Sequence, residues 1–132
     1  MDLKGVAVIV QNQDGNFLLH LRDSNTTRMT NEWCLIGGTL DLQEDSLEGA
    51  CREVKEETNL TLNQPCYLHD FPYNGKQIAL VAGNVDSHEE SLIVGEGADL
   101  QFFTKAEALE LINSLDYTNP YLEQLTDYLK NH

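Results

Sequence analysis

The sequence predicts an α+β protein in which helices cover both faces of a mixed β-sheet. Three observations predict this class. β-rich runs lie before and after one strongly periodic helical segment at residues 45–58, turn signals separate those runs, and two amphipathic helical patterns close the chain. This order of elements is typical of an α/β/α sandwich. A chain of 132 residues has the size of one ordinary domain, so we expect a single domain over residues 1–132.

The chain begins with a predicted β-hairpin. The run Gly5–Gln11 is rich in Val and Ile, an Asp-Gly pair supplies the turn, and Phe17–Arg22 forms the returning strand. His20 alternates with leucines and is most simply a residue on the strand surface. Arg22 ends this strand and Arg28 follows in a polar loop. Either could contact phosphate, and for both the alternative is solvated surface.

A short strand and a helix are predicted next. Residues 33–36 are apolar and lead into Gly37-Gly38, where the missing side chains let the backbone approach a ligand. From Leu47 onward, apolar residues recur at the i, i+3, i+4, i+7 spacing of a helix with one buried face. Asp45 can cap this helix, with Glu48 completing a capping box.

The remaining elements are a second hairpin, one strand and two helices. β-patterned runs at residues 65–71 and 76–85 flank a Pro-Tyr-Asn-Gly turn signal, and a further strand is predicted at Asp99–Phe103. Thr104 begins the first of the two final helices with a capping box. Asn119-Pro120 supplies an N-cap and a first-turn proline for the second.

The composition is that of a globular protein with an acidic surface. Hydrophobic residues make up 41% of the chain, and 22 acidic against 8 basic residues give a formal net charge of −14. Such a charge repels nucleic-acid backbones and anionic membranes, so binding to either is not expected. No signal-type N-terminus or membrane-length apolar run is present, and we expect a cytoplasmic protein. The three cysteines are odd in number and lack metal-type spacing, which predicts free thiols. The sequence leaves open whether the protein forms a homodimer.

Three carboxylates share one stripe of the central helix. Glu53, Glu56 and Glu57 lie at i, i+3 and i+4, so their side chains meet on one side of the helix, offset from the apolar face. Like charges at this spacing repel, and a hard divalent cation would reverse the repulsion. All-oxygen ligands suit Mg²⁺ or Mn²⁺. A solvated Glu-rich surface is the alternative for these three residues taken alone.

The residues around these carboxylates resemble the Nudix box. That pattern is a Gly, five residues, a Glu, seven residues, Arg-Glu, an aliphatic residue, any residue and Glu-Glu, followed after one residue by Gly and an aliphatic residue. The positions that fit are Gly38, Glu44, Arg52, Glu53, Val54, Glu56, Glu57 and Leu60. Ile36, Gln43 and Asn59 depart from the pattern without removing a ligand. Asn59 suits a left-handed helix end, whereas Ile36 and Gln43 bear on loop shape and substrate preference.

The resemblance implies a MutT-type Nudix hydrolase with a mixed sheet and a central catalytic helix. Such an enzyme would use Mg²⁺ or Mn²⁺ to cleave a diphosphate linkage in a nucleoside diphosphate derivative. A nucleoside triphosphate pyrophosphohydrolase acting on ordinary or oxidised nucleotides fits the small size best. A nucleotide-sugar or ADP-ribose pyrophosphatase is the alternative within this class. A non-hydrolytic nucleotide-binding domain is a further alternative, disfavoured because every box carboxylate is present.

The resemblance also implies roles for individual residues. The Gly38 carbonyl would join the box carboxylates in holding the metal, and Glu96, on the loop before the strand that ends Phe102-Phe103, would approach from the opposite side. Glu53 or Glu96 would serve as the base. Arg52 would orient a catalytic carboxylate, and Glu44 would support the loop or add an outer ligand. An acidic turn residue is the alternative for Glu96, with Glu89, Glu90 and Asp99 as its replacements.

Substrate contacts are expected outside the box. Arg22 is a candidate for phosphate, and Phe103 is one of several aromatic candidates, which also include Tyr73 and Phe102. Asn119 has two interpretations: it caps the last helix, or it reads the purine base as an Asn near that helix does in MutT-type members. Capping is the simpler of the two.

Overall fold

A computed structural model describes residues 4–21, 33–86, 99–115 and 119–131 of the chain. Within these ranges it has one seven-stranded sheet and three helices, which confirms the predicted class. The strands are β1 (Lys4–Gln11), β2 (Phe17–Leu21), β3 (Trp33–Cys34), β4 (Ile36–Thr39), β5 (Asn63–Tyr73), β6 (Lys76–Asn84) and β7 (Asp99–Phe103), and the helices are α1 (Ser46–Thr58), α2 (Lys105–Asn113) and α3 (Pro120–Asn131).

The sheet is mixed, as predicted, with β1 near its middle. The strand order is β3-β2-β1-β6-β5, while β4 also pairs with β1 and β7 with β2. β1 runs parallel to β6 along its whole length and antiparallel to β4. A strand covered on both faces reads as a continuous apolar run, which explains the Val- and Ile-rich sequence of β1.

The two predicted hairpins differ in the extent of their pairing. β5 and β6 pair from Asn63 to Tyr73 across a two-residue turn in which Asn74 and Gly75 have φ of 58° and 78°, the left-handed geometry that Asn-Gly favours. β1 and β2 register only at Gln11 opposite Phe17. Beyond that pair β2 leaves β1 and lies between β3 and β7, so the first hairpin exists only at its closed end.

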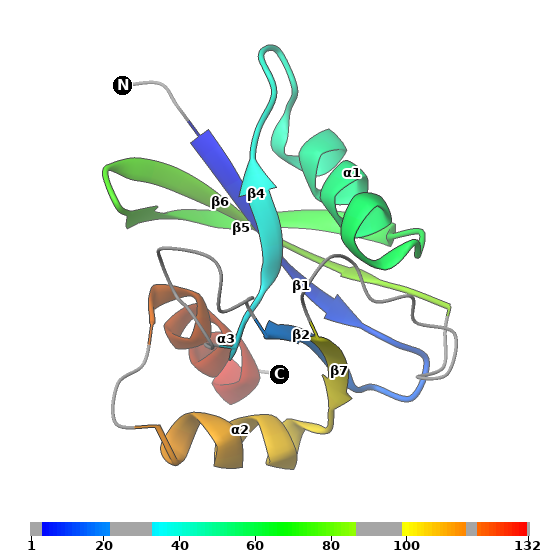
Figure 1. Cartoon of the computed structure of the whole chain (residues 1–132), viewed down its shortest axis with the longest axis vertical. Coiled ribbons are helices and arrows are strands. Elements are labelled where there is room, and N and C mark those ends of the chain that lie inside the picture. Colours follow the sequence, from blue (N-terminus) through cyan, green and yellow to red (C-terminus); the bar gives the residue numbers. More distant parts are fainter. Residues whose placement is uncertain (1–3, 22–32, 87–98, 116–118, 132) are drawn as a thin grey trace.

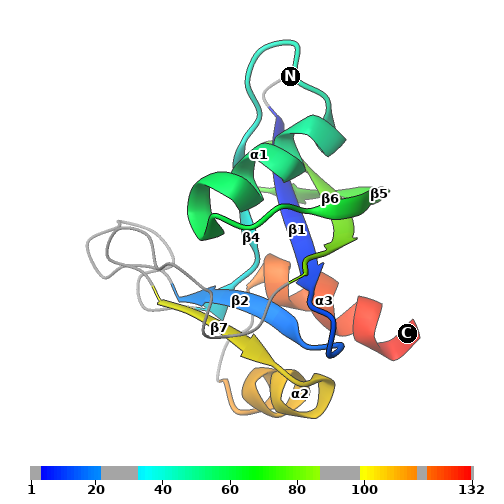
Figure 2. The ribbon, with the colours of Figure 1, turned by 90° about the vertical axis from the view of Figure 1, so that its right-hand side faces the viewer.

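Helices cover both faces of the sheet, as Figures 1 and 2 show. Val6, Val8 and Val10 of β1 pack in a core with Ala50 and Val54 of α1. The alternate residues Ala7 and Ile9 pack in a second core with residues of α2 and α3. Successive side chains of a strand point to opposite faces, so this one strand contributes to both cores and holds α1 at a set position against the sheet.

The pairing of β4 with β1 depends on Gly37. A Cβ atom at this position would collide with the backbone carbonyl oxygen of Val6, so only glycine permits so close an approach. The same pairing places the next residue, Gly38, opposite Val6. β4 is followed by the box loop, residues 40–45, which connects it to the start of α1.

Candidate active site

Local sequence determines where α1 begins and ends. The Asp45 side chain accepts a hydrogen bond from the Glu48 amide at 2.8 Å, and Glu48 accepts one from the Asp45 amide at 3.1 Å, which confirms the capping box. At the other end Asn59 is left-handed, with φ of 64°, and its amide donates to the Lys55 carbonyl at 2.9 Å. Asn thus takes the place of the glycine of the Nudix-box pattern without disturbing the helix end.

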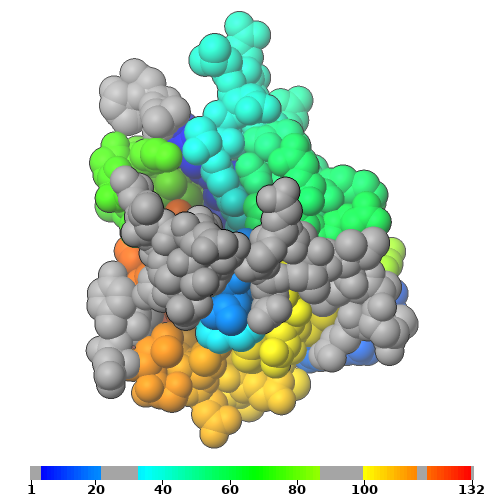
Figure 3. Space-filling model, viewed as in Figure 1, coloured from blue at the N-terminus to red at the C-terminus, as the bar shows by residue number. Residues whose placement is uncertain are grey.

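The backbone of β4 lies directly against the first carboxylate of the stripe. Glu53 is only 8% exposed, and a Cβ atom added at Gly38 would collide with its carboxylate. In the space-filling view, β4 and the box loop (cyan) stand directly beside α1 (green) (Figure 3). A peptide group and a carboxylate are therefore side by side at this point.

Arg52 connects the box loop to the helix. Its Nε and Nη2 donate to the two Glu44 carboxylate oxygens at 2.7 and 2.9 Å, a bidentate pair. Nη1 donates to Glu53 at 3.2 Å and to Glu56 at 3.1 Å. Nη2 also donates to the Thr39 carbonyl at 3.1 Å, which ties the end of β4 to the same guanidinium.

This network controls the ionisation of Glu44. The hydrogen bonds from Arg52, and after them the one from the Asp41 amide, lower the pKa of the Glu44 carboxyl to about 2. The same contact with Glu44 raises the pKa of Arg52 above its ordinary value. Both groups are therefore charged at any physiological pH, and the loop is held to the helix by a permanent ion pair.

Glu57 has a different partner. His20 of β2 reaches across to the helix, with its Nδ1 atom 3.4 Å from Glu57 Oε1. The alternating pattern of β2 predicts only that His20 lies on the strand surface. Alternation gives no information on which helix will pack against that face of the strand. The contact between His20 and Glu57 is created by the packing of α1 on the sheet.

Comparison with known proteins identifies the family. The NUDIX domain model matches residues 1–125. The chain belongs to the NUDIX domain family. Solved structures with the same fold include the MutT protein of Methanosarcina mazei, at 19% identity and a TM-score of 0.72 over 98% of this chain and 93% of that one. A NUDIX-family hydrolase of Clostridium perfringens has 19% identity and a TM-score of 0.74 over 99% and 98%.

Curated relatives match this NUDIX domain over a shorter stretch. The human m7GpppN-mRNA hydrolase NUDT17 is 42% identical over 60 residues, which is 46% of this chain and 18% of the relative. The protein of that name from Xenopus laevis is 40% identical over 60 residues, covering 46% and 20%. The chain thus matches about a fifth of the length of these relatives. The family and these names support the prediction of a hydrolase.

Members of this family generally use divalent metal ions, and the donors of this NUDIX domain fit such an ion. No three His, Cys, Asp or Glu side chains within the described ranges already converge on one point. The reason is that Arg52 turns Glu53 and Glu56 toward itself while Glu57 faces His20. Glu56 is 58% exposed, and an exposed i, i+4 ion pair contributes only a few tenths of a kcal/mol. Its carboxylate can turn to a cation at little cost.

Two of the other predicted site residues lie in the structured core. Phe103 is buried and packs edge-on against Trp33, with ring centroids 5.2 Å apart. Asn119 is 3% exposed, and both ends of its amide are engaged. Its Oδ1 accepts from the Leu122 amide at 2.9 Å, and its Nδ2 donates to the Trp33 carbonyl at 3.0 Å. This geometry is that of an N-cap which also ties α3 to β3.

The remaining candidates fall outside the described residues. Arg22 and Arg28 follow β2, and Glu96, Glu89 and Glu90 precede β7, so nothing is said of their geometry. The side chain of Asp99 is likewise not described. In the parts of the chain that are described, no helix is long and apolar enough to cross a membrane.

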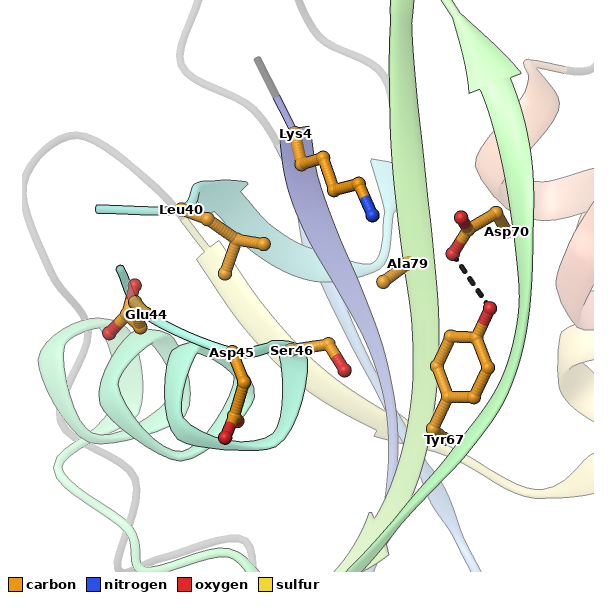
Figure 4. Close-up of a pocket in the computed structure, with 8 residues that line it drawn as sticks. All are labelled: Lys4, Leu40, Glu44, Asp45, Ser46, Tyr67, Asp70 and Ala79. Atoms are coloured by element: carbon orange, nitrogen blue, oxygen red, sulfur yellow. Dashed lines mark hydrogen bonds between the residues drawn. The ribbon is translucent and has the colours of Figure 1, made fainter. Parts of the chain in front are cut away.

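A hollow of about 320 Å³ lies at the start of α1, on the side of β5 and β6 (Figure 4). Among the described residues that line it, Lys4 is the one cation, against the three carboxylates of Glu44, Asp45 and Asp70. Glu44 is taken by Arg52, Asp45 caps α1, and Asp70 accepts a hydrogen bond from the Tyr67 hydroxyl at 2.9 Å. With this excess of negative charge, the hollow is a poor site for a phosphate group.

Proposed function

We propose that this chain is a Mg²⁺- or Mn²⁺-dependent Nudix hydrolase that cleaves a diphosphate linkage in a nucleoside diphosphate derivative. The observation that carries the proposal is the stripe of Glu53, Glu56 and Glu57 on α1, lying beside the Gly38 backbone. Like-charged side chains at this spacing repel one another, and a divalent cation would offset the part of this repulsion that the single charge of Arg52 leaves. The family match over residues 1–125 supports the same reaction class.

The box residues have separate tasks in this proposal. The three stripe carboxylates and the Gly38 carbonyl would hold the metal, which would supply Lewis-acid stabilisation of the developing charge and lower the pKa of bound water. Glu53, the most buried carboxylate of the stripe, is a candidate for the base, with Glu96 as the other. Arg52 positions Glu53 by its hydrogen bond at 3.2 Å, and Glu44 holds Arg52 in place.

The proposed substrate is a nucleoside triphosphate, ordinary or oxidised, hydrolysed to a nucleotide and pyrophosphate. Arg22 is the proposed phosphate contact. Base reading by Asn119 would require the side chain to give up its cap to Leu122 or its bond to Trp33, so we favour its capping role. Nucleotide sugars and ADP-ribose are the alternative substrates. We propose a small-molecule partner and a cytoplasmic location, because the net charge of −14 disfavours polymeric anions.

A second candidate substrate is a capped dinucleotide. It is favoured by the 42% identity over 60 residues to a protein named as an m7GpppN-mRNA hydrolase. A cap carries the same phosphoanhydride linkages as a nucleoside triphosphate. The acidic surface favours the short cap over a long RNA.

The test is a panel of nucleoside triphosphates, oxidised nucleotides, ADP-ribose, nucleotide sugars and m7GpppG with the purified chain and Mg²⁺ or Mn²⁺. Pyrophosphate, phosphate and mononucleotides are measured separately, because their ratio identifies the bond that is cleaved. We expect Glu56→Gln and Glu57→Gln each to lower turnover by about 100-fold or more. Glu110→Gln, an exposed change on α2, is the matched control and should leave turnover unchanged.

Two results would contradict the proposal. Unchanged turnover in both Glu56→Gln and Glu57→Gln would show that these carboxylates are not metal ligands. Tight nucleotide binding without metal and without product, measured by isothermal titration, would favour the non-hydrolytic binding domain instead.

A further inference from the structure

We propose that His20 is a positioning residue that orients Glu57 for metal binding. The imidazole would donate from Nδ1 to Glu57 Oε1 and hold that carboxylate in one orientation toward the cation. The inference rests on the proposed function, since it takes Glu57 as a metal ligand. It adds a residue from β2, outside the box, to the set that determines metal affinity.

The sheet places His20 on the face that α1 covers. Leu18, two residues earlier on β2, belongs to the core beneath α1, and residues two apart on a strand share a face. The backbone of His20 is paired on both sides, with Cys34 of β3 and with Leu100 of β7. A side chain on a strand held from both sides is a rigid support for a group on the helix.

The contact is shielded from solvent. His20 and Glu57 are 16% and 24% exposed at the side chain, against 58% for the neighbouring Glu56. A contact from which water is partly excluded is less screened than an exposed pair. The Nδ1–Oε1 contact is therefore less screened than the contact of the exposed Glu56 with Arg52, and it favours one orientation of the Glu57 carboxylate.

The contacts described for the stripe go to two residues on different elements. Arg52 reaches Glu53 and Glu56, whereas Glu57 is met by His20. Glu57 also lies in the last turn of α1, where the negative end of the helix dipole disfavours a carboxylate. A neutral imidazole with its proton on Nδ1 is a hydrogen-bond donor, so the contact does not require a charged histidine. Loss of a hydrogen-bonding partner of a metal ligand typically changes metal affinity by 10- to 100-fold.

The test compares Mn²⁺ affinity, measured by titration of the free-ion electron paramagnetic resonance signal, in His20→Leu and His20→Asn. Leu removes the donor and places an apolar residue at this strand position, and we expect about tenfold weaker Mn²⁺ binding. The amide nitrogen of Asn can occupy the place of Nδ1, so His20→Asn should bind nearly as the wild type does. Turnover of His20→Leu should recover when the Mn²⁺ concentration is raised.

His69→Leu is the matched control. His69 lies on β5, and its Nε2 contacts Gln124 of α3 at 2.7 Å, away from the stripe. Its loss should leave Mn²⁺ affinity unchanged. A double-mutant cycle completes the test, because His20→Leu should have no further effect on Mn²⁺ affinity once Glu57→Gln has removed the carboxylate that it positions.

The outcomes separate this inference from the function on which it rests. Unchanged Mn²⁺ affinity in a folded His20→Leu protein would overturn the inference alone, and so would an equal loss in His20→Asn. If His20→Leu does not fold, His20→Phe, which also lacks a donor at this position, replaces it in each comparison, and unchanged Mn²⁺ affinity in His20→Phe overturns the inference. No Mn²⁺ binding by the wild type would overturn both the inference and the proposed function.

Discussion

α1 and α3 lie on opposite faces of the same sheet, and both begin at a side-chain cap. Each buries an apolar face, with Val54 of α1 and Leu122 of α3 fully enclosed. They differ in their polar residues. The buried Asn119 at the start of α3 is satisfied by neutral hydrogen bonds within the fold, whereas α1 collects carboxylates that need a cationic partner. The Asn119 amide thus stabilises the fold by itself. The carboxylates of Glu53 and Glu56 instead repel one another and need the positive charge of Arg52.

Among the predicted changes, replacement of Arg52 should have the largest effect, and the effect should be on turnover. Arg52→Gln removes the cation shared by Glu44, Glu53 and Glu56, so the stripe carboxylates lose their orientation and repel one another. We expect turnover to fall about 100-fold, equivalent to about 3 kcal/mol in the barrier. Steady-state kinetics with Mg²⁺ would measure it. Arg52→Lys should not restore activity, because an ammonium cannot make the bidentate pair with Glu44; recovery by Lys would show that charge alone suffices.

Asn119 should show the opposite pattern, a loss of stability with little loss of turnover. Asn119→Ala removes the cap and leaves the Trp33 carbonyl without its donor, so the free energy of unfolding should fall by about 2 kcal/mol. Urea unfolding of both proteins would measure it. Asn119→Asp keeps the capping oxygen and loses only the donor to Trp33. A change in substrate preference at unchanged stability would instead support base reading.

The ion pair of Glu44 predicts a dependence of stability on pH. Its pKa in the folded state is about 2, below the ordinary 4.5, so its contribution is complete above pH 4.5 and is lost as the pH falls toward 2. With allowance for solvent screening we expect about 1 kcal/mol. Urea unfolding of the wild type and Glu44→Gln at pH 7 and pH 3 would test this. The difference between the two proteins should shrink at the lower pH, and a constant difference would contradict the assignment.

The smallest effect is expected at the tip of the box loop. Leu42 is 96% exposed and buries almost no apolar surface. Leu42→Ser should change the free energy of unfolding by less than about 0.5 kcal/mol. Thermal unfolding would measure it, with Leu122→Ala in the core of α3 as the contrasting variant at about 3 kcal/mol. A large loss for Leu42→Ser would mean that the loop packs against something in solution.

Local interactions made parts of the site predictable. The capping box of α1, the left-handed Asn59 and the carboxylate stripe depend on residues within four positions of one another, and a helix has one geometry for such neighbours. The β5–β6 hairpin was predictable because its turn residues accept positive φ. The β1–β2 hairpin was only partly predictable. β1 pairs mainly with β4 and β6, and β2 pairs mainly with β3 and β7, so most of the hairpin pairing is replaced.

The sequence by itself determined the class of fold, the helix proposed to carry the chemistry and the identity of the carboxylates on it. These follow from short-range periodicity and from a spacing of residues that one helix turns into one stripe. Only the tertiary structure decided which groups surround that stripe. Gly38 meets Glu53, Glu44 meets Arg52, and His20 meets Glu57, because α1 packs at one angle on a sheet whose strands come from distant parts of the chain. Spacing along the chain contains no information on such contacts.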